Sequence, residues 1–85
     1  MDVVITDRAK ERYKNLNLPD SVIKNIVSGN KGIKFYDKKT KRYIYKYNKL
    51  VVVVEHNKSE RKVITAFRNN TPGHFGYSNR YVEVF

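Results

Sequence analysis

The residues best suited to proton transfer are the two histidines of the chain, because histidine alone has an ordinary pKa close to neutrality. His74 stands between Gly73 and Gly76 in a polar segment, and it is the better candidate for a general acid or base. A solvent-exposed loop position without a chemical role explains His74 about equally well. His56 follows Glu55 at the expected end of a hairpin, where an exposed turn residue is the more common explanation.

Three arginines could hold a phosphate group beside such a histidine, because a planar guanidinium group donates paired hydrogen bonds to phosphate oxygens. Arg8 and Arg12 are one helical turn apart and therefore share a face of the expected first helix. Arg68 ends the last strand of the expected meander and could approach the same face. For each arginine, an ordinary surface or ion-pairing role fits the sequence equally well.

Other kinds of site are not indicated by the sequence. The 85 residues include no Cys, and the 8 carboxylates show no paired spacing, so we expect neither a zinc nor a magnesium site and no cofactor. No phosphate-binding glycine loop, dinucleotide fingerprint or nucleophile elbow is found. No apolar run reaches the roughly 18 residues that cross a bilayer, and no signal-peptide pattern is seen, so we expect a cytoplasmic protein without a membrane partner.

The net charge of +10 is concentrated between residues 31 and 68, where 12 Lys and Arg against 3 Asp and Glu leave +9. Such a concentration favours a polyanionic partner, and RNA is the partner we expect. A solvated, lysine-rich surface is the alternative. The tyrosines among these cations could stack on bases or be half-buried core residues. The candidate RNA-binding residues are Arg42, Tyr45, Lys46, Arg61, Lys62, Tyr77 and Arg80.

The elements that must position these side chains begin with three consecutive antiparallel strands between Lys41 and Arg68. Tyrosines alternate with other residues in the first of them, and the apolar run Leu50–Val54 is typical of a central strand. Asn48 and Lys49 leave room only for a two-residue turn, in which Asn tolerates a positive φ. A preceding strand over residues 32–36 completes a four-stranded antiparallel β-meander.

Two helices precede the meander. Thr6 is a good N-cap for the first helix, and a second helix begins at Pro19 or Asp20 and stops at Gly29. The sequence therefore predicts a single α+β domain over residues 1–85, with two N-terminal helices packed on one face of the meander. An extra C-terminal strand over residues 81–85 is compatible with its alternating pattern. The expected core consists of Ala9, Ile23, Ile26, Val27, Leu50, Val52, Val54 and Ile64.

This order of elements carries a resemblance to a known superfamily. The residues concerned are Ile5-Thr6-x-x-Ala9-x-x-Arg12, Ser28-Gly29-Asn30 and the strand Val63-Ile64-Thr65-Ala66-Phe67. Over residues 5 to about 68 the chain resembles the small phage and bacterial domains of the BECR superfamily, which joins barnase, EndoU, colicin tRNases and RelE-type toxins. The first helix in that family usually carries a His just before the Ala, where this chain has Arg8.

The resemblance implies a metal-independent, toxin-like endoribonuclease, with an acidic antitoxin or immunity protein as a further partner. Metal-independent RNA cleavage needs a base, an acid and cations beside the phosphate. The expected catalytic residues are Arg8, Arg12, Arg68 and His74. The alternative is a non-catalytic nucleic-acid-binding protein or a phage regulatory or interaction protein that holds the same partner through Lys, Arg and Tyr.

Overall fold

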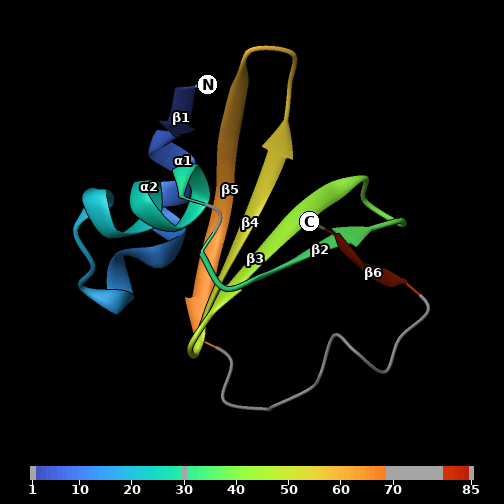
Figure 1. The fold of residues 1–85 in the computed structure, drawn as a ribbon. Coiled ribbons are helices and arrows are strands. Elements are labelled where there is room, and N and C mark those ends of the chain that lie inside the picture. Colours follow the sequence, from blue (N-terminus) through green and yellow to red (C-terminus); the bar gives the residue numbers. More distant parts are fainter. Residues whose placement is uncertain (1, 30, 69–79, 85) are drawn as a thin grey trace.

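The computed structural model describes residues 2–29, 31–68 and 80–84, and these ranges contain two α-helices, a short 3₁₀ turn and six strands (Figure 1). The elements in chain order are β1 (Asp2–Ile5), α1 (Asp7–Tyr13), the 3₁₀ turn (Lys14–Leu16), α2 (Asp20–Ser28), β2 (Ile33–Asp37), β3 (Arg42–Tyr47), β4 (Leu50–His56), β5 (Glu60–Arg68) and β6 (Tyr81–Val84).

The described strands form one mixed sheet in the order β1-β5-β4-β3-β2-β6. The meander from β2 to β5 is antiparallel as expected, and β6 adds the extra C-terminal strand by pairing antiparallel with β2. The expectation of four strands was wrong, because β1 also joins the sheet and runs parallel to β5. The physical reason is that β5 would otherwise leave its outer edge unpaired beside the N-terminal segment.

Both helices cover the same face of the sheet, as predicted. In Figure 1, α1 and α2 lie beside β1 and β5, whereas β2 and β6 extend away from them. Apolar residues of both helices pack there on β3, β4 and β5. This core includes six of the eight predicted members, and Leu50 packs at its margin. The fully or nearly buried members are Ala9, Tyr13, Ile23, Ile26, Val27, Tyr45, Val52, Val54, Val63 and Ala66.

The prediction that Ile64 belongs to this core was wrong. The register between β4 and β5 shifts between Val53 and Val54, which pair with Thr65 and Val63 and leave Ile64 without a place in the alternation. Val63 and Ala66 therefore both point to the helices, although they are three positions apart in the strand. Ile64 is only partly buried and lies outside the core.

Two local signals predicted from the sequence, the cap at Thr6 and the turn at Asn48, are present where expected. The Thr6 hydroxyl accepts a hydrogen bond from the Ala9 amide at 3.1 Å and caps α1. Asn48 has a φ of 55° in the two-residue turn between β3 and β4. Gly32, with a φ of 76°, enters β2 so close to β3 that a Cβ there would lie 2.1 Å from the Lys46 carbonyl oxygen. These turns set the register that places the side chains described next.

Candidate functional site

Six polar and aromatic side chains gather on the helix-covered face of the sheet, and we refer to them as the His56 cluster. They come from four neighbouring strands: Lys34 and Tyr36 from β2, Tyr43 and Tyr45 from β3, His56 from β4 and Arg61 from β5. The register brings them together, since Tyr45 pairs with Lys34, Tyr36 with Tyr43, and His56 with Arg61. The alternation of strand residues puts all six on the face that carries the core.

A hydrogen-bonded chain runs through the His56 cluster from the end of α2. Arg61 Nη1 donates to the Val27 carbonyl and to Tyr45 Oη, both at 3.0 Å, and Tyr45 Oη lies 3.1 Å from His56 Nε2. Arginine can only donate, so the phenolic oxygen accepts from Arg61. The last contact then runs either from the tyrosine hydroxyl to Nε2 or from Nε2–H to the second lone pair of Oη. The chain fixes the position of the imidazole ring in both cases.

Aromatic and cationic groups surround the imidazole. Tyr43 stacks on His56 with ring centroids 3.8 Å apart and an interplanar angle of 15°. Tyr36 lies against Tyr43 at 5.1 Å. Lys34 Nζ lies 5.7 Å and 5.6 Å from the ring centroids of Tyr43 and Tyr45. Only Tyr45 is fully buried, whereas the other five members are partly exposed and can be reached from solvent.

The surroundings change the protonation of the cluster. The pKa of His56 is lowered from 6.5 to about 4, chiefly by burial and in addition by the positive charges of Arg61 and Lys34. Burial and Arg61 also lower the pKa of Lys34. Burial raises the pKa of the Tyr45 hydroxyl, although Arg61 opposes this effect. At neutral pH, His56 is therefore an uncharged imidazole beside two cations.

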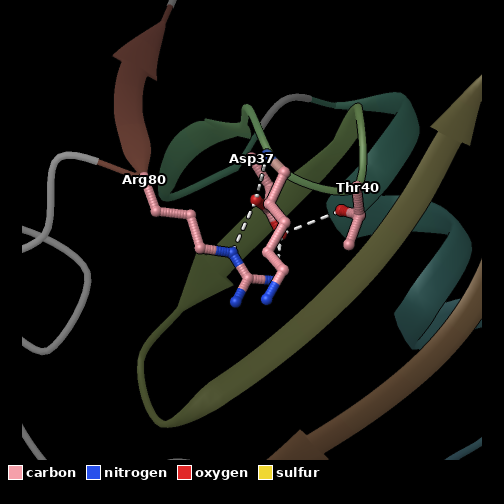
Figure 2. Close-up of polar contacts among 4 residues, drawn as sticks. Asp37, Thr40 and Arg80 are labelled. Atoms are coloured by element: carbon pink, nitrogen blue, oxygen red, sulfur yellow. Dashed lines mark hydrogen bonds and ion pairs between the residues drawn. The ribbon is translucent and has the colours of Figure 1, made fainter.

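A second polar contact links the end of β2 to the start of β6 through Asp37 and Arg80. Arg80 is one of the predicted RNA-binding residues. Figure 2 shows the Arg80 guanidinium directed at the Asp37 carboxylate, with Nε donating to Oδ1 at 2.7 Å and Nη2 to Oδ2 at 2.8 Å. The Thr40 hydroxyl and the Lys39 amide also donate to Asp37. The hydrogen bond from Arg80 is the main cause that holds the pKa of this buried carboxyl well below its usual range. The guanidinium group of Arg80 thus has a structural partner.

The remaining predicted RNA-binding residues divide between the two faces of the sheet. Tyr45 and Arg61 belong to the His56 cluster. The opposite face carries three partly buried cations, Arg42, Lys46 and Lys62. Lys46 pairs there with Ile33 of β2 and Val51 of β4. That face also carries a small apolar cluster of Phe35, Ile44 and Val51. Tyr77 lies outside the described residues.

The four predicted catalytic residues are not gathered in one place by the described part of the chain. Arg8 and Arg12 line a pocket of about 320 Å³ together with Arg42. Arg68 lines a different pocket, of about 570 Å³, whose other walls include Leu18 and Val22. His74 lies outside the described residues, so its predicted role stays a prediction.

Neither His56 nor Lys34 is among the site residues that the sequence predicts. His56 is the last residue of β4 and is held by Tyr45, so the expectation of an exposed turn residue was wrong. A signal was present, because residues 52, 54 and 56 alternate along one strand and must share a face. The position of Lys34 beside Tyr45 could be predicted only from the pairing of β2 with β3. The sequence indicates that pairing only through the turn between the two strands.

Comparisons of the chain with protein-family models, with curated proteins and with solved structures found no match. No helix within the described ranges is long and apolar enough to cross a membrane. In the same ranges, no three His, Cys, Asp or Glu side chains gather in a way that could hold a metal ion. The function proposed for this chain therefore rests on the geometry of its own side chains.

Proposed function

We propose that the protein binds RNA and cleaves it without a metal ion, with the His56 cluster as the reaction site. The observation that carries this proposal is the convergence of a neutral imidazole and two cations, His56, Lys34 and Arg61, on a partly exposed aromatic surface. Cleavage of this kind requires a proton acceptor beside groups that stabilise a negatively charged phosphate. Stacking surfaces for unpaired bases are supplied by Tyr36 and Tyr43.

In the proposed reaction, His56 accepts the proton of a ribose 2′-hydroxyl. The arrangement in which Nε2–H donates to Tyr45 Oη leaves the Nδ1 lone pair available for this proton. The 2′-oxygen then forms a bond to phosphorus while the bond from phosphorus to the 5′-oxygen breaks. The products are a 2′,3′-cyclic phosphate and a 5′-hydroxyl end.

The two cations have complementary roles in this reaction. Lys34 donates a proton to the departing 5′-oxygen, and its lowered pKa makes that proton easier to release. Arg61 stays charged and stabilises the negative charge that develops on the phosphate. A bound phosphate also offsets the positive charges that lower the pKa of His56, so substrate binding makes the imidazole a stronger base.

The proposal is tested by cleavage of total RNA in EDTA, using the wild type, His56→Gln and Lys34→Met. Removing a positioned acid or base typically lowers the rate by about a hundred- to ten-thousand-fold, and we expect losses in this range. His74→Gln is the matched control, because it removes the other histidine, and it also tests the role that the sequence predicts for His74. Activity that depends on His74 alone, or that disappears in EDTA, would contradict the proposed site.

Binding of RNA without cleavage is the second candidate function. The neighbouring rings of Tyr36, Tyr43 and His56, with Lys34 above the Tyr43 ring, also favour this non-catalytic role. Binding of RNA without cleavage of any RNA offered would select this alternative.

The acidic antitoxin or immunity protein implied by the resemblance stays a prediction, checked by rescue of growth when a neighbouring gene is co-expressed. The cytoplasm is the compartment that we propose for either activity.

A further inference from the structure

A second concentration of positive charge lies apart from the His56 cluster, in a pocket beside α1. Arg8 and Arg12 of α1 and Arg42 of β3 line its volume of about 320 Å³, and Thr6 and Ile64 complete the wall. Arg42 extends from the sheet face opposite the His56 cluster, because successive residues of a strand alternate between faces. The pocket is therefore a separate site that none of the steps proposed above uses.

The charge of this pocket is not neutralised by the described part of the chain. Neither Arg8 nor Arg12 takes part in any ion pair between described residues. Arg42 Nε lies 3.9 Å from Glu55 Oε2, a long contact between side chains that are 38% and 41% exposed. Three guanidinium groups against one distant carboxylate leave an excess of two positive charges. Such an arrangement is stabilised by an anion that carries about two negative charges.

The other polar group of the wall is already occupied. The Thr6 hydroxyl accepts from the Ala9 amide at 3.1 Å and donates to the Val63 carbonyl at 3.5 Å. Recognition of a ligand therefore falls to the guanidinium groups, whose paired donors match the oxygens of a phosphate. A phosphodiester inside a chain has one negative charge and two free oxygens. A terminal phosphate has three free oxygens and, near neutral pH, close to two negative charges.

We infer that the pocket formed by Arg8, Arg12 and Arg42 binds a doubly charged phosphate group. Its source is either the 5′-terminal phosphate of a nucleic acid strand or free inorganic phosphate, and both present the same chemistry to the three arginines. Binding of inorganic phosphate requires no RNA cleavage and no contribution from the His56 cluster. The inference can therefore fail or hold independently of the proposed ribonuclease activity.

The first arm of the test is a titration of the intact protein with inorganic phosphate, followed by NMR of the arginine side chains. We expect saturable shifts at Arg8, Arg12 and Arg42. The double variant Arg8→Gln/Arg12→Gln should bind at least about tenfold more weakly. The matched control Lys14→Gln/Lys24→Gln removes the same charge from exposed positions in the 3₁₀ turn and in α2 and should bind as the wild type does.

The second arm compares 2′-O-methyl RNA oligonucleotides, which lack the attacking hydroxyl, with a 5′-phosphate or a 5′-hydroxyl end. Tighter binding of the 5′-phosphate form, lost in Arg8→Gln/Arg12→Gln but kept in the control, identifies the strand end as the source. Phosphate shifts without this preference identify free phosphate instead. The absence of saturable shifts at the three arginines, or equal loss of phosphate binding in the control variant, overturns the inference.

Discussion

His56 should resist protonation much more strongly than an ordinary histidine, and the stability of the protein should depend on pH as a result. Its pKa falls from 6.5 to about 4, chiefly through burial and further through Arg61 and Lys34. The unfolded chain binds a proton at this residue near pH 6.5, whereas the folded chain binds it only near pH 4. The contribution of the uncharged His56 to the free energy of unfolding is complete above pH 6.5 and is lost as the pH falls from 6.5 to 4.

The size of this contribution follows from the two pKa values of His56, 6.5 in the unfolded chain and about 4 in the folded chain. The difference between them corresponds to about 3 kcal/mol of unfolding free energy. Because the His56 side chain is partly exposed, solvent screening reduces the effect, and we expect about 1 to 2 kcal/mol. His56→Gln cannot titrate and should lack this part of the pH dependence. Lys34→Met removes one of the two cations and should raise the pKa of His56.

Two measurements check this prediction. An NMR titration gives the pKa of His56, whose signals are identified by their loss in His56→Gln. Urea unfolding at pH 7 and near pH 4 gives the pH dependence of stability for the wild type and for His56→Gln, so that carboxylates common to both proteins cancel. A His56 pKa near 6.5 in the wild type, or the same pH dependence in both proteins, would refute the reasoning.

Three further predictions concern the fold and the charged surface. Val63→Ala should lower the free energy of unfolding by about 2 kcal/mol and Ile64→Ala by less than about 1 kcal/mol, because the bulge puts only Val63 in the core. Urea unfolding of the two variants checks this difference. Asp37→Asn should lower it by about 2 kcal/mol by leaving Arg80 without its carboxylate; an unchanged unfolding midpoint would contradict the structural role of the pair. RNA affinity should fall steadily as salt rises, with a log–log slope of about −0.7 per phosphate contacted, and a flat response in filter binding would favour a merely solvated surface.

Local signals in the sequence were enough to predict the helices and the meander. Thr6 supplies a cap through its own hydroxyl, and Asn48 supplies the positive φ that a two-residue turn needs. Each of these signals acts over a few residues, so no knowledge of distant contacts was required.

The errors concern interactions between residues far apart in the chain. The pairing of β1 with β5 depends on an edge that exists only after the meander has formed. The bulge beside Ile64 is a property of two strands together and is invisible in the alternation of one. The His56 cluster likewise needs the register of four strands before Lys34 and Arg61 approach the imidazole. The sequence could therefore supply the residue types of the site but not the grouping that gives them a role.

The most direct test of the proposed function uses an oligonucleotide with a single ribose in an otherwise 2′-deoxy strand, incubated in EDTA with the wild type and with His56→Gln. We predict cleavage by the wild type only after that ribose, with a 2′,3′-cyclic phosphate and a 5′-hydroxyl as the new ends. The rate should be at least about a hundredfold lower for His56→Gln. Equal cleavage by the two proteins, or tight binding of RNA substrates without any cleavage by the wild type, would contradict this prediction.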